Sequence, residues 1–387
     1  PFLDEIAGRP VFVKAECLQH TGSFKFRGAW NAVSALRERG DLKGVIAFSS
    51  GNHAQGVALA AKRQGLPAVI SYAMSEVASS ANMAFAMYPG LSHGAYESLH
   101  RWGTEEQKQT WLPRCVSGDT ILAIAMTEPG AGSDLQSIRT TAVRDGNGWR
   151  LNGMKRFNTG LHSANYDMIF ARTSGEDGSH KGISCFIVPT DSEGFSVDFM
   201  WWTFNMPSDH AEVTLKDVWV PDTALLGPLD DGLALAQTFV HENRIRQAAS
   251  GIGAAQYCVN EAVDYARQRK TWGKPLATNQ AIQFPLAELE TDIEMTRWLV
   301  YRTAWGLDHQ HHMAMTDKIS MANYRANRIV CQAADLAIQV HGGMGYTRHK
   351  DFEHIYRHHR RYRITEGAEE IQIRKVAGHL FGFIGKN

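Results

Sequence analysis

The sequence has no excess of charge of either sign, no paired cysteines and no long apolar run. Its 387 residues carry 40 Lys and Arg against 40 Asp and Glu, which argues against a nucleic-acid or anionic-membrane partner. The five cysteines are scattered and form no Cys-x-x-Cys pair, which indicates reduced thiols and neither a disulfide framework nor a zinc site. We find no stretch of membrane-span length and no charged-then-apolar leader. These absences predict a cytoplasmic protein, or one of the mitochondrial matrix if a leader was removed.

The pattern of apolar residues changes along the chain between strand-like and helix-like runs. These changes predict four parts and an α+β fold class. Residues 1–72 alternate β-rich runs with helical ones, including a third strand at PAVISY (67–72), which indicates a truncated α/β parallel-sheet fragment. Residues 73–118 predict a remnant helical domain. Residues 119–227 contain short alternating runs between turns, typical of an antiparallel barrel or sandwich. Residues 228–387 keep a helical apolar stripe that predicts a four-helix bundle.

The loop AMTEPGAGSD, residues 125–134, is the strongest chemical signal. Its glycines permit a tight backbone path that presents N–H groups and the hydroxyls of Thr127 and Ser133 to a ligand. Taken alone, such a loop is as often only a turn. Here four further motifs follow it in order: GWRLNGMKRFNTG, RQRKTWGKPLATNQAIQ, QVHGGMGYTR and RITEGAEEIQIRK. Together these motifs resemble the acyl-CoA dehydrogenase family across roughly residues 75–387.

The resemblance implies a helical layer, a central β-barrel and a C-terminal four-helix bundle that bind FAD. Arg269 and Thr271 would meet the FAD pyrophosphate, and Gln280 with the Gln339–Gly343 stretch would close round the adenosine half from a neighbouring subunit. Phe157 stands where the family usually has a tryptophan. The cofactor-binding residues implied are Met126, Thr127, Gly132, Ser133, Phe157, Thr159, Arg269, Thr271, Gln280, Gln339, Gly342, Gly343, Gly367 and Glu370.

Glu366 in the TEG motif matches the catalytic base of the family. The implied reaction removes an α-proton from an acyl-CoA thioester while a hydride leaves the β-carbon for flavin N5. Ser133, Asn243 and Arg244 match substrate-site positions; some relatives carry the base at the position of Asn243, where an amide cannot act as one. A structural alternative makes Glu366 only a carboxylate favoured at a helix N-terminus. Expected partners are an electron-transferring flavoprotein and further copies in a homodimer or homotetramer.

The motifs HTGSFKFRGA and SSGNHAQG give residues 11–70 a resemblance to pyridoxal-phosphate threonine/serine dehydratases. In that comparison Lys25 is the Schiff-base lysine and Asn52 contacts the pyridine ring. The resemblance ends before a glycine-rich phosphate cup, without which the cofactor loses its anchor. Two alternatives to the dehydrogenase therefore stay open, namely a pyridoxal-phosphate ammonia-lyase that uses Lys25 and an inactive hybrid.

Two histidine-rich stretches are explained by exposed surface at least as well as by a binding site. HQHH at 309–312 has no acidic or cysteine partner at metal-ligand spacing, so we expect a solvated helix end and no metal site. The basic run near 357–361 is compatible with phosphate binding, although a surface patch explains it equally well.

Overall fold

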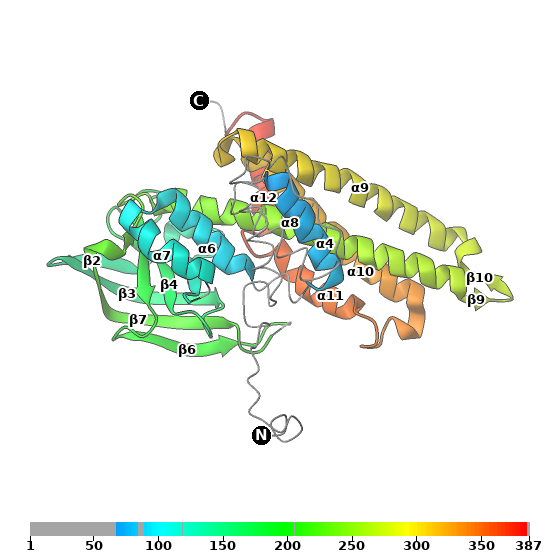
Figure 1. The fold of residues 1–387 in the computed structure, drawn as a ribbon, viewed down its shortest axis with the longest axis horizontal. Helices are drawn as coiled ribbons and strands as arrows, with labels where there is room; N and C mark the ends of the chain where they lie inside the picture. Colours follow the sequence, from blue (N-terminus) through cyan, green and yellow to red (C-terminus); the bar gives the residue numbers. More distant parts are fainter. Residues whose placement is uncertain (1–66, 84–88, 118, 205, 385–387) are drawn as a thin grey trace, which may run out of the picture. The chain divides into compact units, whose positions relative to one another are not determined.

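A computed structural model describes residues 67–83, 89–117, 119–204 and 206–384. The chain divides into two compact units, Pro1–Leu66 and Pro67–Asn387, and the described residues all belong to the second (Figure 1). Lys25 and Asn52, the residues of the dehydratase-like alternative, lie outside the described residues.

The second unit begins with a helix where the sequence predicts a strand. Helix α4 covers Ala68–Ala81, so the strand predicted at PAVISY is wrong and the predicted boundary at residue 72 falls inside a helix. The Tyr72 hydroxyl donates to Glu242 at 2.8 Å, and one turn later Glu76 accepts from Arg297 at 2.8 Å. These contacts recur at helical spacing, so packing against later helices overrides the β propensity of the Val-Ile-Ser-Tyr run.

The next two helices, α6 (Pro89–Trp102) and α7 (Glu105–Ser117), form a short helical hairpin. Thr104 and Gln107 make the reciprocal bonds of a capping box: the Gln107 N–H donates to Thr104 Oγ1 at 3.1 Å, and the Thr104 N–H donates to Gln107 Oε1 at 3.0 Å. The Gln107 amide also donates to the carbonyl of Leu225 at 2.9 Å, which ties α7 to the β-rich part.

A mostly antiparallel sheet follows, with strand order β6-β7-β3-β2-β4-β5-β8 and with β1 pairing alongside β4 in parallel. Its core is made of alternating inward residues such as Leu151, Phe186 and Val213. The antiparallel pairing confirms the predicted β-rich middle part, whereas closure into a barrel stays a prediction. The strands are β1 (Leu122–Ala125), β2 (Thr141–Asp145), β3 (Gly148–Thr159), β4 (Tyr166–Arg172), β5 (Ile183–Pro189), β6 (Phe195–Trp201), β7 (His210–Pro221) and β8 (Leu225–Leu226).

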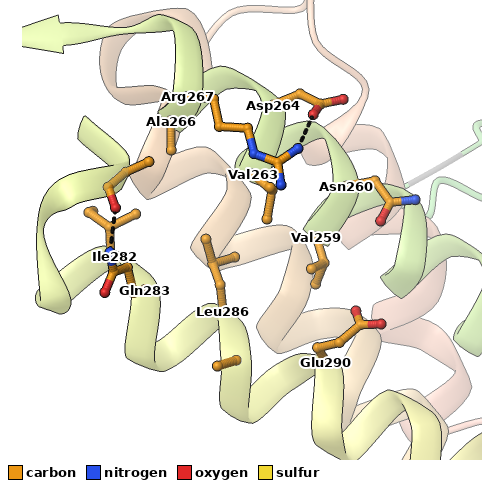
Figure 2. A pocket seen from close by; sticks show the side chains of 12 residues that line it. Val259, Asn260, Val263, Asp264, Ala266, Arg267, Ile282, Gln283, Leu286 and Glu290 are labelled. Carbon is orange, nitrogen blue, oxygen red and sulfur yellow. Dashed lines mark hydrogen bonds and ion pairs between the residues drawn. The ribbon is translucent and has the colours of Figure 1, made fainter. Parts of the chain in front are cut away.

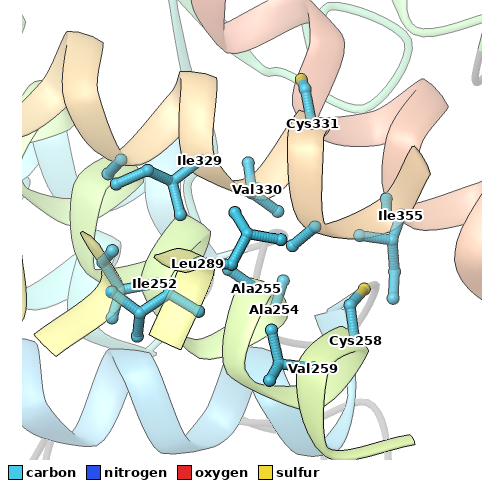
Figure 3. Packing of buried hydrophobic residues seen from close by; sticks show 14 of the residues in the cluster. Ile252, Ala254, Ala255, Cys258, Val259, Leu289, Ile329, Val330, Cys331 and Ile355 are labelled. Atoms are coloured by element: carbon cyan, nitrogen blue, oxygen red, sulfur yellow. The ribbon is translucent and has the colours of Figure 1, made fainter. Parts of the chain in front are cut away.

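The remainder is helical, as predicted. The three long helices α8 (Gly232–Gln268), α9 (Gln280–His309) and α10 (Thr316–His341) pack against one another (Figure 1). Figure 3 shows Ile252 and Val259 of α8 meeting Leu289 of α9 and Ile329 of α10 in the shared core. The short hairpin β9–β10 (Lys270–Thr271 and Lys274–Pro275) links α8 to α9, and α11 (Phe352–Arg360) and α12 (Glu369–Leu380) end the unit. Within the described residues, none of these helices has both the length and the apolar character that crossing a bilayer requires.

The close approach of α4 to α8 at Gly253 gives a direct test of this packing. A Cβ built on Gly253 would lie 2.1 Å from the Glu76 carbonyl oxygen, whereas one on Gly251 would lie 3.4 Å from its nearest neighbour. We expect Gly253→Ala to lower the free energy of unfolding by about 1–3 kcal/mol because α4 must move. The matched control Gly251→Ala gains helix propensity and should be neutral or stabilising by up to about 1 kcal/mol. Urea unfolding measures both, and equal values for the two variants would contradict the α4–α8 contact.

Candidate active site

Glu366 lies in a strained loop between a short 3₁₀ turn at Arg361–Arg363 and the start of α12. Its φ of 57° is in the left-handed region that side chains other than glycine avoid, and Gly367 follows with a φ of 87°. Such backbone conformations cost of order 1–3 kcal/mol and persist where the surroundings impose them, often at active sites. Phe157 and Trp272, in two other motifs, share this region with φ of 58° and 50°.

Arg244 of α8 imposes the conformation of this loop. Its Nε and Nη2 both donate to the Glu366 carbonyl oxygen, at 2.8 and 2.6 Å, and the residue is only 2% exposed. A Cβ built on Gly367 would lie 2.8 Å from Arg244 Nη2, so the close approach also requires glycine at that position. Burial lowers the pKa of the Arg244 guanidinium to about 10, against the opposing effect of Glu366.

The Glu366 carboxyl has the electrostatic character of a base that works near neutral pH. Burial raises its pKa to about 7, although the charges of Arg244, Arg246 and Arg361 oppose the shift. Among the described residues, no group donates a hydrogen bond to its carboxylate oxygens. The side chain is therefore positioned through its backbone and left available to a ligand.

Glu369 anchors the start of α12. Its two oxygens accept from Arg363 at 2.9 and 2.8 Å and from Arg328 of α10 at 3.2 Å each. The hydrogen bond from Arg363 is the main cause that lowers its pKa to about 2. These hydrogen bonds from two arginines hold the segment that carries Glu366. The next residue, Glu370, is exposed.

Asn243, the predicted substrate-site amide, is fully buried one residue before Arg244. Its Oδ1 accepts from Arg246 Nη2 at 3.0 Å, while its Nδ2 has no partner within the described part of the chain. Helix α6 approaches it at Gly94, where a built Cβ would lie 3.3 Å from that nitrogen.

The six predicted flavin-side residues come together where the 126–133 loop meets β3. The Arg156 N–H donates to the Thr127 carbonyl at 2.8 Å, and the buried Lys155 ammonium bonds Glu128 at 2.7 Å. Phe157 stays half exposed and its ring lies 5.5 Å from that of Trp201. Met126, Thr127, Gly132, Ser133, Phe157 and Thr159 therefore lie on two segments, the 126–133 loop and the end of β3, which the backbone hydrogen bond from Arg156 to Thr127 joins.

The end of β3 and the Glu366 loop share an electrostatic neighbour, Arg361. The Gly160 N–H, at the end of β3, donates to the Asp209 carbonyl at 2.7 Å. Although burial works to raise the pKa of the Asp209 carboxyl, the hydrogen bond from His210 and charges that include Arg361 lower it. The charge of Arg361 therefore acts both on Asp209, whose carbonyl accepts from the end of β3, and on Glu366.

The predicted adenosine-side residues form a separate group at the far end of α8. The Leu276 N–H donates to the Arg269 carbonyl at 2.7 Å, and the Tyr265 ring stacks on His341 at 4.3 Å, which brings the end of α10 beside the hairpin. Arg269, Thr271, Gln280, Gln339, Gly342 and Gly343 gather there. At about 1.5 Å per residue, Arg269 lies about 37 Å along α8 from Arg244.

Comparisons with known proteins identify the family of the chain. Family models described as "Acyl-CoA dehydrogenase, C-terminal domain" and "Acyl-CoA dehydrogenase, middle domain" match residues 230–381 and 123–218. A Bacillus subtilis acyl-CoA dehydrogenase is 38% identical over 282 residues, which cover 73% of this chain and 74% of the relative. This chain belongs to the acyl-CoA dehydrogenase family. It is therefore an oxidoreductase acting on CH–CH bonds, and membership implies FAD as its cofactor.

Other relatives in the family carry different names. A 3-(aryl)acrylate reductase of Clostridium sporogenes is 39% identical, with 72% of this chain and 73% of the relative covered. A subunit of the caffeyl-CoA reductase-Etf complex of Acetobacterium woodii is 36% identical, covering 72% and 73%. Among solved structures, a Geobacillus kaustophilus acyl-CoA dehydrogenase is 30% identical with a TM-score of 0.73 and 92% of each chain covered.

The N-terminal resemblance is also found. A model described as "Pyridoxal-phosphate dependent enzyme" matches residues 1–90. The described part of that match includes α4, whose Tyr72 and Glu76 pack on α8 and α9, so this helix belongs structurally to the dehydrogenase unit.

Several histidines are buried, which the sequence patterns do not reveal. His312 is buried and its Nδ1 lies 2.9 Å from His241 Nδ1, so the solvated helix end expected at 309–312 is wrong for this residue. His358 and His359 are likewise buried, and burial lowers the pKa of both, so the expected surface patch is wrong for them. Packing of α8 against the loops after α9 and α10 buries these side chains.

A groove of about 560 Å³ between α8 and α9 lies apart from these residues (Figure 2). Val263 and Leu286 form part of its floor, and Arg267 pairs with Asp264 at its rim. The groove contains none of the predicted site residues. Because the predicted site residues lie elsewhere, we assign the candidate active site to the Glu366 loop and not to this groove.

Proposed function

We propose that this chain is an FAD-dependent acyl-CoA dehydrogenase that forms an α,β double bond in an acyl-CoA thioester with Glu366 as the base. The observation that carries the proposal is an ionisable, partly buried carboxyl without a hydrogen-bond donor among the described residues, on a strained loop clamped by Arg244. Family membership supports the reaction class. A structure in the same family, a Mycobacterium smegmatis glutaryl-CoA dehydrogenase in complex with FADH2, is 25% identical with a TM-score of 0.75 and covers 94% of this chain and 90% of its own.

The residues present fit the cofactor. The half-exposed Phe157 provides an apolar wall for a flat ring, and Thr127, Ser133 and Thr159 provide hydroxyl donors beside it. A Cβ built on Gly132 meets nothing within 4 Å, so the backbone there is open to a ligand. Bound FAD supplies the acceptor for the hydride that leaves the β-carbon.

The protein's own groups handle the proton. Glu366 takes the α-proton, and its raised pKa gives it the basicity that a weakly acidic C–H demands. The Glu366 N–H has no acceptor within the described part of the chain and would donate to the thioester oxygen, where negative charge develops. Arg244 keeps both groups in place through the Glu366 carbonyl.

The rate of flavin reduction is expected to depend on pH through Glu366. Because the base must be ionised and its pKa is raised to about 7, the rate should rise about tenfold per pH unit below pH 7 and level off above it. Anaerobic stopped-flow reduction by an acyl-CoA between pH 5 and pH 9 measures this profile. A midpoint near 4.5, the ordinary value for a glutamate, would show that the buried carboxyl is not the base.

The separation of the two residue groups supports a homo-oligomer. About 37 Å along α8 is farther than one FAD molecule spans, so Arg269, Thr271 and the Gln339–Gly343 stretch would serve the adenosine half of an FAD whose ring lies in a second copy. We therefore propose a homodimer or homotetramer. The relative named as part of an Etf complex supports an electron-transferring flavoprotein as the electron acceptor.

A second candidate rests on the match of residues 1–90 to the pyridoxal-phosphate model. It would use Lys25 as a Schiff base beside Asn52. Purified protein separates the candidates by colour: a flavin spectrum bleached by an acyl-CoA supports the dehydrogenase, and an aldimine band reduced by borohydride supports the ammonia-lyase. Protein without any chromophore after FAD is supplied would indicate the inactive hybrid.

A further inference from the structure

Three buried hydrogen-bond donors without partners lie on α8 close to Arg244 in sequence and on the residue before Glu366. Asn243 Nδ2, Arg246 Nε and the Thr365 hydroxyl have no hydrogen-bond partner within the described part of the chain, although each atom is buried. Buried donors are normally satisfied, because each one left unpaired costs roughly 1–3 kcal/mol. Three such groups, on the helix that clamps the Glu366 loop and on the loop itself, indicate that a ligand completes their hydrogen bonding.

Arg246 is the charged member of this set. It lies three residues after Asn243 on α8, so the two side chains share a helix face, and its Nη2 donates to Asn243 Oδ1 at 3.0 Å. No carboxylate of the described residues forms an ion pair with it. The neighbouring Glu242 has two partners of its own. It accepts from the Tyr72 hydroxyl at 2.8 Å, and His93 Nε2 lies 2.9 Å from its carboxylate.

The charges that face Arg246 from other elements do not neutralise it. Its charge acts on His358 and Glu366 of segment 358–366 and on Tyr72 of α4, on which Glu242 and Glu97 also act. Glu242 is bound by Tyr72 and His93, Glu97 lies 3.8 Å from His93 Nε2, and Glu366 must exchange a proton with the substrate during the proposed reaction. A hydrocarbon acyl chain laid against this face would leave a partly buried cation and an amide unpaired.

We propose that Arg246 and Asn243 recognise an anionic acceptor group on the acyl chain, so that the preferred substrate is a CoA thioester carrying a second, distal carboxylate. This inference rests on the proposed acyl-CoA dehydrogenase function. The guanidinium donates to a carboxylate through charge-assisted hydrogen bonds, and the Asn243 amide adds a neutral donor beside it. Arg246 is then a specificity-determining residue, separate in role from Arg244, which holds the Glu366 carbonyl.

The test compares plain and ω-carboxylated acyl-CoA thioesters of matched chain length on the FAD-loaded protein. Wild type should favour the carboxylated series in kcat/KM, and Arg246→Met should reduce that preference by roughly 30-fold or more. Arg246→Lys, which keeps the charge but loses the fork, should retain part of it. Arg267→Met, the same change at an exposed arginine of the same helix, is the matched control and should change nothing.

A binding measurement separates recognition from chemistry. Titration calorimetry with unreactive S-(ω-carboxyalkyl)-CoA and S-alkyl-CoA thioethers should show tighter binding of the carboxylated ligand, lost in Arg246→Met. If Arg246→Met instead shifts the pH profile of both thioester series equally and leaves their ratio unchanged, the arginine only adjusts Glu366 and the inference is overturned. Bleaching by neither series in wild type would overturn the proposed function itself, whereas bleaching by plain thioesters alone overturns only this inference.

Discussion

Glu366→Gln should retain bound FAD and reduce the rate of flavin reduction by an acyl-CoA at least about 10³-fold. General-base catalysis contributes typically about 10²–10⁴-fold, and no neighbouring group replaces this carboxylate, because Asn243 is an amide and Glu369 is held by two arginines. The substitution keeps the size of the side chain and removes none of the hydrogen bonds to its backbone carbonyl. Flavin content by absorbance and turnover with an artificial acceptor measure the two halves of this prediction.

The same variant should be more stable than wild type at high pH. A carboxyl whose folded pKa is raised contributes its full stability below its unfolded value of 4.5 and loses it as pH rises through about 7. Glutamine stays neutral throughout, so the two proteins should have equal stability near pH 4, diverge between about pH 4.5 and pH 7, and keep a constant difference of about 1–3 kcal/mol above pH 7. Glu288→Gln, at an exposed position on α9, is the control and should show neither effect. Loss of flavin from Glu366→Gln would mean that the residue is structural.

Arg244→Met should have the second largest effect, and activity should fall further than stability. The substitution removes both donors from the Glu366 carbonyl, so the loop loses the contacts that hold its left-handed conformation. A displacement of about 1 Å at a catalytic group can lower a rate about 10²-fold. Stability should fall less, by about 1–3 kcal/mol, because the apolar side chain also removes a buried cation whose pKa burial already lowers.

Measuring kcat and the urea midpoint of Arg244→Met beside Arg267→Met checks this expectation. The control removes an exposed arginine of the same helix that forms only a surface pair with Asp264. Normal turnover in a well-folded Arg244→Met protein would show that Glu366 does not depend on the clamp.

The sequence predicts the order of the parts better than it predicts the surroundings of Glu366. Glu366 and Arg244 are reached from local motifs, because their neighbours in the chain carry the pattern. Arg246 is missed because its role depends on segment 358–366, more than a hundred residues away, packing on the same face of α8. The spacing from Asn243 to Arg246 was the available signal, since residues three apart share a helix face.

Burial of polar groups is the other feature that local patterns do not show. His312 and His358 lie in runs that suggest solvent exposure, yet both are covered by helices distant in sequence. The strand predicted at 67–72 fails for a related reason, since its apolar side chains pack on α8 and α9 at helical spacing. Conversely, the Thr104–Gln107 capping box is a feature that a local pattern can show, because its bonds span only three residues.

The central claim, that the position 366 carboxylate removes a proton α to a thioester, is tested most directly by isotope substitution. Purified wild type and Glu366→Gln are loaded with FAD and mixed anaerobically with an acyl-CoA that carries hydrogen or deuterium at its α-carbon, while flavin absorbance is followed. The account predicts rapid bleaching by wild type that slows with the deuterated thioester, and negligible bleaching by the variant. Rapid, deuterium-sensitive bleaching by Glu366→Gln would contradict it, because another group would then be removing the proton.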